Sequence, residues 1–451
     1  MRFSGIKTAV IICLVISAVY LTEQLWFEKI SSHNYLPSFI SGFGYAPAQS
    51  GANTDFLAMP ERMVTGVGGG AYSIKYNGLQ GSAAKTACDA VIDAALKNGS
   101  AGALTALDWP LILSRPGFLY QYAFNMPSDA FVLRFKQKNI ALTSKIGSFT
   151  DIAVYPVDSS VSGVIFIDGA GRRAFGCQIS DGQLAAQLSA ALDSARRADS
   201  FLYISTSQGG SDNPGVNIFV PQSASPHSYA HLAISNPYSG PGGVLYKNII
   251  PLIGIFFDKP SSQWANNPDN YTFSDGSNFV RYLPNDVLEY DNYSVPDTSA
   301  DTAFADAYAA ALAMIAADKT VANDYFLAAY DQSGASRVFS FDYAVDDFPI
   351  LIPDTLASDI GLKHIIEVTV QNGRVVKYKK LAYNFNQSGK VSGANLQFRQ
   401  VFESIAKQSG GGSGGITFDS VNIGYKAEKS NDIKLNWFIG VNNHMFVQGV
   451  D

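Results

Sequence analysis

An uncharged run near the start of the chain constrains its fold more than any other stretch. Residues 8–22 carry no charged side chain and lie directly behind Arg2 and Lys7. A helix over residues 8–27 would be about 30 Å long, which matches the hydrocarbon core of a bilayer. We therefore predict a cytoplasmic tip and a transmembrane helix over residues 1–28, followed by folded domains.

The residues that flank this run predict how it crosses the membrane. Arg2 and Lys7 precede it and Glu23 follows it, so the positive-inside rule places the N-terminus in the cytoplasm. Trp26 has the amphipathic ring that suits the outer interface. We expect a single-pass protein of the cell membrane with the bulk of the chain extracellular. A cleaved signal peptide has the same layout and is the alternative, although residues 18–21 make a poor cleavage site.

Small residues in the predicted helix are candidates for contact with a partner helix. Ala9, Ser17 and Ala18 would allow close approach of a second helix within the bilayer. A plain anchor facing lipid explains the same residues, and both interpretations stay open. With Trp26, these three form the predicted set of interaction residues.

The composition indicates folded domains and excludes one class of partner. Hydrophobic residues make up 47% of the 451 residues, so packed cores are expected and a disordered tail is not. A chain of this length forms two to four domains. The formal net charge of −6 argues against nucleic acid as a partner, because binding a polyanion requires a basic surface.

Two of the three cysteines, Cys88 and Cys177, fall in the part of the chain predicted outside the cytoplasm. A disulfide is chemically allowed there. Two buried free thiols are the default, because nothing in the surrounding sequence predicts that the two backbones approach each other. The sequence leaves the bridge open.

A first α+β domain is predicted over residues 29–199. Its opening part, residues 29–70, is rich in Gly and Pro and is expected to be irregular, with Gly66–Gly70 as a flexible connector. The predicted helices are 82–96, with Ser82 as N-cap, and 181–197. The predicted strands are 71–76, 111–113, 118–124, 131–135, 152–155 and 163–167.

Two further α+β domains are predicted, a middle one over residues 200–296 and a C-terminal one over 297–451. Asp275-Gly276 and Asn372-Gly373 each separate two alternating arms, which is a strong hairpin signal. The predicted helices are 302–317 and 396–407, and 243–257 is expected to be a helix running into a strand. The predicted strands are 201–204, 217–220, 231–234, 271–282 as a hairpin, 287–290, 325–330, 337–343, 364–370, 374–385, 416–425, 435–441 and 444–447.

Histidines give no persuasive metal or catalytic signature. His227 and His231 are four residues apart, a spacing that suits metal ligands on a helix. They follow Pro226 and run into a strand-like segment, so surface or hydrogen-bonded histidines are the simpler interpretation. The GxSxG match at residues 411–415 lies in a Gly- and Ser-rich loop, so it does not indicate a nucleophile elbow between a strand and a helix. We predict no catalytic residue, no metal site and no cofactor.

Charged pairs have equally ordinary explanations. Asp346-Asp347, and Asp301 with Asp306, could serve as acid and base, but paired acids at turns and helix starts are usually caps or solvated faces. Arg172-Arg173 and Arg196-Arg197 are weak candidates for an anion site. The sequence therefore supplies no reason to propose an enzyme.

Four stretches resemble the YycH family of membrane-anchored proteins. Val19–Phe27 resembles the Leu-Thr-x-x-Leu-Trp segment through which that family leaves the membrane. The other stretches are Tyr271–Tyr282 with Leu288-Glu289-Tyr290, Phe339–Tyr343 with Phe348-Pro349, and Val421–Tyr425 with Leu435-Asn436-Trp437. The last stretch departs from the family at Asn436, because the related ending in YycH and its relative YycI has a proline between the Leu and the Trp.

The resemblance implies a function as well as a fold. It implies three domains in a membrane-anchored protein of Firmicutes, with no catalytic activity. Such proteins bind the sensor histidine kinase WalK/YycG of a cell-wall two-component system and adjust its activity, usually alongside a YycI-like protein. The alternative is an extracytoplasmic ligand-binding protein or enzyme acting on the cell wall, which would need a concave site with converging polar groups.

Overall fold

The computed structural model describes residues 59–76, 79, 82–98, 104–135, 144–197, 202–206, 219–221, 227–240, 243–244, 246–257, 262–267, 270–294, 302–394, 398–408, 418–441 and 444–450. The predicted anchor and its interaction residues Ala9, Ser17, Ala18 and Trp26 lie outside these ranges. Within the described ranges, no helix combines the length and the apolar character that a membrane crossing demands.

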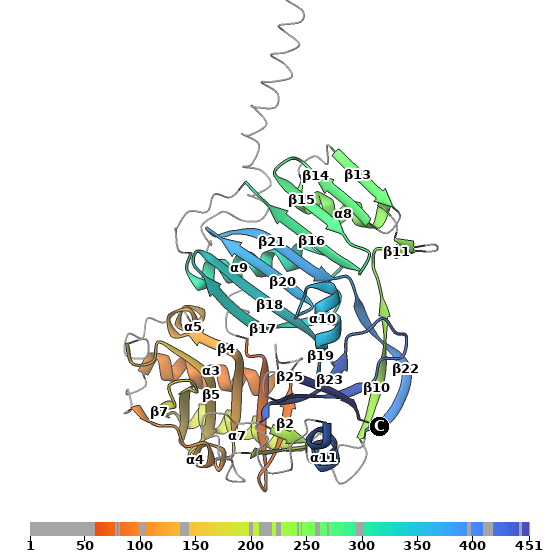
Figure 1. Ribbon diagram of the computed structural model, residues 1–451. Helices are drawn as coiled ribbons and strands as arrows, with labels where there is room; N and C mark the ends of the chain where they lie inside the picture. The colour runs from red at the N-terminus through yellow and green to blue at the C-terminus, as the bar shows by residue number, and fades with distance from the viewer. Residues whose placement is uncertain are drawn as a thin grey trace, which may run out of the picture. The chain divides into compact units, whose positions relative to one another are not determined.

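Antiparallel sheets with helices packed on them make up the described part of the chain (Figure 1). A nine-stranded sheet comes from residues before 222, and a twelve-stranded sheet comes from residues after 261. Among the described strands, one neighbouring pair runs parallel, β19 (Phe348–Leu351) with β23 (Phe418–Lys426). This architecture confirms the predicted α+β class with antiparallel sheets.

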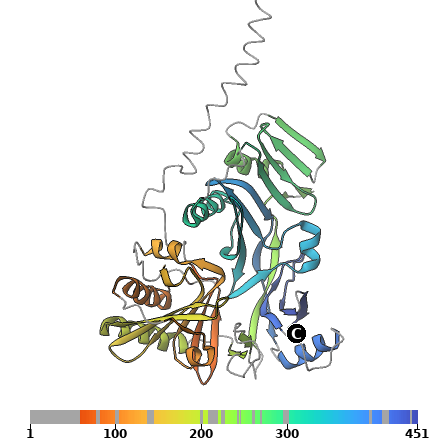
Figure 2. The ribbon, with the colours of Figure 1, turned by 60° about the vertical axis from the view of Figure 1, so that its left-hand side comes forward.

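The two faces of the nine-stranded sheet are covered differently. α3 (Ala83–Asn98) and α7 (Gly182–Arg197) lie together on one face, as Figure 2 shows. The short α4 (Trp109–Leu113) covers part of the opposite face, and Phe326 from the twelve-stranded sheet packs into the same cluster. The strands are, in sheet order, β3 (Leu104–Ala106), β7 (Arg173–Ser180), β6 (Val161–Asp168), β5 (Ser148–Pro156), β4 (Phe118–Pro127), β1 (Arg62–Gly68), β2 (Ala71–Lys75), β8 (Tyr203–Ser205) and β9 (Phe219–Pro221).

The twelve-stranded sheet is the support for α9 (Phe304–Ala317), which packs across its middle strands. Ala307 and Ala311 are fully buried, so the helix backbone lies close to the sheet. The strands are, in sheet order, β13 (Ser262–Asn267), β14 (Asn270–Ser274), β15 (Asn278–Tyr282), β16 (Val287–Asn292), β21 (Arg374–Leu381), β20 (Ile366–Gln371), β18 (Ser336–Val345), β19, β23, β24 (Leu435–Val441) and β25 (His444–Gly449), with β17 (Asp324–Ser333) also paired to β18.

A long ribbon of two antiparallel strands, β10 (His227–Ser235) and β22 (Asn384–Ala394), joins chain segments far apart in sequence. Backbone bonds between Leu232 and Ile433 tie it to the segment between β23 and β24. The remaining elements are α5 (Ser128–Arg134), α8 (Tyr246–Phe256), α10 (Asp354–Ile360), α11 (Phe398–Gln408), β11 (Ser239–Gly240) and β12 (Gly243–Val244).

The turn and cap residues identified in the sequence form the expected local structures. Asp275-Gly276 joins β14 to β15, and its Asp275 carboxylate accepts the backbone N–H of Asn278 at 2.7 Å. Asn372 and Gly373 join β20 to β21 with φ of 50° and 70°, the left-handed pair that a tight hairpin requires. The Ser82 hydroxyl accepts the backbone N–H of Lys85 at 3.2 Å, so Ser82 caps α3 as predicted.

Four short predictions were wrong. Residues 243–257 form the short strand β12 followed by α8, and not a helix running into a strand. Residues 62–68 form β1, a central strand, and not part of an irregular connector. Residues 111–113 belong to α4, because Pro110 suits a first helical turn and the Asp108 carboxylate accepts the Leu111 N–H at 3.0 Å. Residues 131–134 belong to α5, whose Phe131 packs edge-on against Phe149 with ring centres 5.0 Å apart. In addition, the strands β3, β7, β11, β13 and β19, most of β22, and the helix α10 were not among the predicted elements.

The expected domain boundaries at residues 199 and 296 stay predictions. β16, before residue 296, pairs with β21, after it, so strand pairing continues across that position. The nine-stranded sheet contributes to a hydrophobic cluster that includes Phe326 and Ala344 of the twelve-stranded sheet. Each proposed domain therefore shares contacts with its neighbours.

Candidate functional site

The acidic and basic pairs singled out from the sequence have structural roles where they are described. Asp346 and Asp347 form the turn between β18 and β19, with φ of 50° and 65°. Arg173 pairs with Asp168, whose carboxylate lies 2.6 Å from the guanidinium. Arg196 stands at the end of α7, 3.5 Å from Asp193. Asp301 lies outside the described residues, so the arrangement of Asp301 with Asp306 is not tested.

The two cysteines of the described ranges are free and buried. Cys88 on α3 is fully buried, and burial raises the pKa of its thiol well above the ordinary range. Cys177 on β7 is 7% exposed, and burial raises its pKa to about 11. The default of two free thiols is confirmed, and neither thiol is prepared for nucleophilic chemistry, because the thiolate is the reactive form.

His231 is the centre of a hydrogen-bonded series that the sequence did not reveal. Its Nδ1 lies 2.8 Å from the Asp432 carboxylate, and its Nε2 lies 2.7 Å from the Ser392 hydroxyl. The imidazole is buried on β10, while Asp432 also receives the Lys390 ammonium at 3.1 Å. The His231 hydrogen bond, together with Lys390, lowers the pKa of Asp432.

This series has the connectivity of nucleophile, base and orienting acid. Ser392 lies opposite Tyr229 within the extended β10–β22 ribbon, unlike the sharp strand-to-helix turn that exposes the serine in many hydrolases. The same bonds link β10, β22 and the segment after β23, so they also hold the ribbon in place. His227 lies at the start of β10, and no group of three His, Cys, Asp or Glu side chains in the described ranges is arranged to hold a metal.

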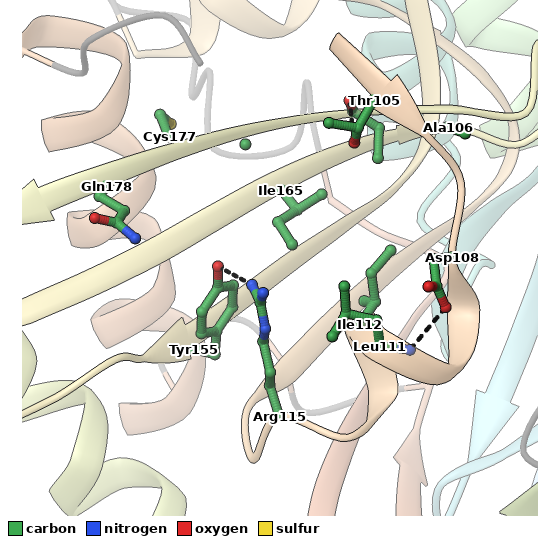
Figure 3. A pocket seen from close by; sticks show the side chains of 12 residues that line it. Thr105, Ala106, Asp108, Leu111, Ile112, Arg115, Tyr155, Ile165, Cys177 and Gln178 are labelled. Atoms are coloured by element: carbon green, nitrogen blue, oxygen red, sulfur yellow. Dashed lines mark hydrogen bonds between the residues drawn. The ribbon is translucent and has the colours of Figure 1, made fainter. Parts of the chain in front are cut away.

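An open pocket of about 450 Å³ lies on the nine-stranded sheet beside α4 (Figure 3). It occupies the face opposite α3 and α7, where α4 leaves the strands β5, β6 and β7 uncovered. Ile112 and Ile165 are almost buried in its wall, whereas Leu111 is 54% exposed at its rim. The volume falls within the ordinary range for small-molecule sites, about 300–1,000 Å³.

Arg115 and Tyr155 form the polar wall of this pocket. The Arg115 guanidinium donates a hydrogen bond to the Tyr155 hydroxyl and lies 4.6 Å from the centre of its ring. Burial raises the pKa of Tyr155, partly offset by the Arg115 charge, so the phenol keeps its proton. Arg115 follows Ser114 at the end of α4, and the helix therefore positions it over the sheet.

Glycines give the pocket its shape. A Cβ on Gly163 would lie 2.3 Å from the Tyr155 ring, so the ring rests directly on the β6 backbone. A Cβ on Gly117 would lie 2.5 Å from the Val154 carbonyl. At Gly176, on the pocket floor, a Cβ would meet its nearest neighbour at 3.8 Å. Gly163 and Gly117 therefore set the ring position, while Gly176 leaves space open.

A partly buried polar cluster connects the two large sheets. The Arg62 guanidinium on β1 donates to Gln121 at 2.9 Å, to the Tyr76 hydroxyl at 2.7 Å and to Asn422 of β23 at 3.2 Å. Gln121 in turn donates to Asp151 at 2.9 Å. These polar groups hydrogen-bond to one another within the protein, so we interpret the cluster as structural.

Sequence reasoning missed Arg115, Tyr155 and the His231 series for one reason. Ser392 is 161 positions and Asp432 is 201 positions from His231, so no local spacing joins them. Ser114-Arg115-Pro116 was interpreted only as the end of a strand. The helix-capping signal at Asp108-Trp109-Pro110 would have identified α4, although not the sheet beneath it.

Comparisons with known proteins place this geometry in a known fold. Neither the known family profiles nor the curated protein sequences contain a match to the chain. The crystal structure of YycH from Bacillus subtilis matches with a TM-score of 0.56 and 12% identity, over 88% of this chain and 96% of that chain. This chain therefore has the fold of that protein, which confirms the resemblance found in the sequence at the level of the fold.

Two other solved structures are more distant. An uncharacterized protein from Eubacterium rectale has a TM-score of 0.33 and 11% identity, covering 51% of this chain and 86% of that chain. The YpeB C-terminal domain from Bacillus megaterium has a TM-score of 0.28 and 10% identity, covering 46% of this chain and 98% of that chain. Likenesses of this size support no argument about the present chain.

Proposed function

We propose that this chain, which has the fold of YycH, is a membrane-anchored regulator of a cell-wall sensor histidine kinase of the WalK/YycG type. The observation that carries the proposal is the extent of the fold match, which includes 88% of this chain and 96% of the solved YycH chain. Regulation without catalysis is the role that the sequence resemblance implies, and a YycI-like protein is the expected second partner.

The positions of the resembling stretches support the same proposal. Tyr271–Tyr282 lies on β14 and β15, Phe339–Tyr343 on β18, and Val421–Tyr425 on β23. All four strands belong to the twelve-stranded sheet. Stretches that are far apart in the sequence thus form one structural body.

A regulator of this kind needs only a differential contact with two states of the kinase. A preference of about one or two kcal/mol would change kinase output several-fold. In the proposed arrangement, the small residues Ala9, Ser17 and Ala18 allow close approach of the kinase helix in the bilayer, with Trp26 at the outer interface. Contacts of the extracellular body add to this through effective concentration.

The test is co-purification of the kinase with the full-length chain from membranes. We expect recovery of the kinase, and loss of that recovery when residues 1–28 are exchanged for an unrelated anchor. Ala18→Leu should weaken recovery, while Ile16→Leu, a control on the opposite side of the helix from Ala18, should not. Full recovery after the exchange would contradict the membrane contact, and failure of the unaltered chain to recover any kinase would contradict the function.

The predicted topology has its own test. Protease added to intact cells should digest the body of the protein and leave a short anchored fragment. Protection of the body in intact cells, with digestion after lysis, would contradict the extracellular location.

One observation favours the alternative of an extracytoplasmic enzyme, namely the Ser392–His231–Asp432 series with distances of 2.7 and 2.8 Å. If Ser392 is a nucleophile, a fluorophosphonate probe will label it, and both Ser392→Ala and His231→Gln will abolish the label. Ser404→Ala, a helical serine on α11, is the control and should leave labelling unchanged. Absence of label on the folded protein would remove this alternative.

A further inference from the structure

The pocket beside α4 presents two neighbouring donors, Arg115 and Tyr155, and this geometry assigns a ligand class. We propose that the pocket binds a small molecule with one carboxylate on a short apolar body. The inference concerns the nine-stranded sheet alone and does not depend on regulation of a kinase.

Arg115 and Tyr155 supply the carboxylate site. Arg115 donates to the Tyr155 hydroxyl, which leaves the other guanidinium N–H groups and the phenol hydrogen available. Among the described residues, neither group has a further hydrogen-bond partner. Figure 3 shows both side chains facing the same open space. Two donors side by side match the two oxygens of a carboxylate.

The charge balance of the pocket favours a monoanion. The pocket lining carries one cation, Arg115, and one carboxylate, Asp108, and within the described part of the chain Arg115 makes no ion pair with a carboxylate. Asp108 lies on the same lining, and its carboxylate accepts the Leu111 N–H at 3.0 Å. Binding takes the charge of the ligand out of water, which costs more for a phosphate dianion than for a carboxylate, and one carboxylate already balances the one guanidinium.

The floor and wall of the pocket are apolar, so the ligand needs an apolar body. Ile112, Ile165 and Ala174 are 7%, 8% and 5% exposed and pack side by side below the opening. Gly176 leaves room above the strand because it has no side chain. An aliphatic chain or a few small apolar residues would fill this space and cover the exposed face of Leu111.

Two sources supply a carboxylate with the same chemistry, the C-terminal end of a short peptide and a free aliphatic acid. The experiment titrates the purified full-length chain with N-acetyl-Ala-Ala and, separately, with octanoate. The matching amides, N-acetyl-Ala-Ala-amide and octanamide, serve as uncharged controls, and inorganic phosphate serves as the rejected anion. Calorimetry or ligand-observed NMR gives the dissociation constants.

We expect saturable binding of at least one carboxylate, and the carboxylate that binds identifies the source. Its amide should bind roughly tenfold to a hundredfold more weakly, because a charge-assisted contact is lost. No saturable binding of either carboxylate, equal binding of acid and amide, or equally tight binding of phosphate would overturn the proposal.

Three variants locate the binding. Arg115→Met should weaken the carboxylate to the level of its amide, while Arg197→Met, on the exposed end of α7, should leave binding unchanged. Gly176→Leu should abolish binding of acid and amide alike by filling the floor. Unchanged binding by Arg115→Met, with an unchanged melting temperature, would overturn the assignment even if Gly176→Leu failed to fold.

Discussion

The ammonium of Lys380 lies 2.6 Å from the carboxylate of Asp318, and the two side chains are only 2% and 0% exposed. Tyr378 donates a second hydrogen bond to Asp318 at 2.8 Å. Lys380 is on β21 and Asp318 ends α9, so this buried pair fastens the helix to the twelve-stranded sheet.

Removing one partner of the Lys380–Asp318 pair should destabilise the fold much more than replacing both partners with apolar residues. Asp318→Asn leaves a buried ammonium without a counter-charge, and we expect a loss of about 3–5 kcal/mol in the free energy of unfolding. The double variant Asp318→Leu with Lys380→Met should lose much less, because no charge is left buried. Urea unfolding measures both, and a double variant as unstable as the single one would contradict this account.

His364 should make stability depend on pH. Burial lowers the pKa of His364, but the Asp342 carboxylate at 2.8 Å outweighs it, so the net pKa is raised from 6.5. The stabilisation from this pair is complete below the pKa that His364 has in the unfolded chain. It is lost as pH rises through the raised pKa of His364 in the folded chain. We expect stability to fall across this range above pH 6.5 in the unaltered chain.

Two variants separate this effect from other titrations. His364→Gln and Asp342→Asn should each flatten the same part of the stability profile. The amide oxygen introduced by Asp342→Asn can still accept the Ile365 N–H, which the native carboxylate accepts at 3.0 Å. Thermal unfolding at a series of pH values gives the profiles. A His364→Gln profile identical to that of the unaltered chain would show that this pair does not carry the dependence.

Gly424 should tolerate no side chain. A Cβ there would lie 2.5 Å from the Pro349 carbonyl, because β23 runs alongside β19 at this point. Gly424→Ala should destabilise the chain by about 1–3 kcal/mol through overpacking. Gly449→Ala is the matched control, since no atom lies within 4 Å of its Cβ position on β25. Equal stability of the two variants would refute the close approach.

The thiols should be inert in the folded chain and reactive after unfolding. In a Cys13→Ser background, iodoacetamide at mildly alkaline pH should leave Cys88 and Cys177 unmodified, because both are buried and have raised pKa values. Urea without reductant should expose both to alkylation, as mass spectrometry will record. Protection that persists in urea and disappears with reductant would reveal a disulfide.

Local sequence signals predicted elements whose formation depends on neighbours in the chain. Asn372-Gly373 specifies a hairpin because both residues accept positive φ, and Ser82 starts α3 because its hydroxyl replaces a missing backbone partner. Leu184, Leu188 and Leu192 predicted α7, because apolar residues spaced four apart lie on one face of a helix.

Tertiary packing decided the elements with ambiguous local signals. Residues 131–134 fit either a strand or a helix over so short a length, and the contacts of Phe131 with Phe149 and Phe166 favoured the helix. Residues 62–68 lie in the stretch 29–70 that was expected to be irregular, yet β4 and β2 pair on either side of them. Strand pairing supplied what the Gly-rich sequence did not indicate.

By itself, the sequence determined the α+β class, the main hairpins and helices, and the resemblance to YycH. Only the tertiary structure decided that Arg115 and Tyr155 share a pocket and that Ser392 and Asp432 meet on His231. The physical reason is distance along the chain. Periodicity and turn chemistry act over a few residues, whereas a site forms where separate strands and helices are brought together by burial of apolar surface.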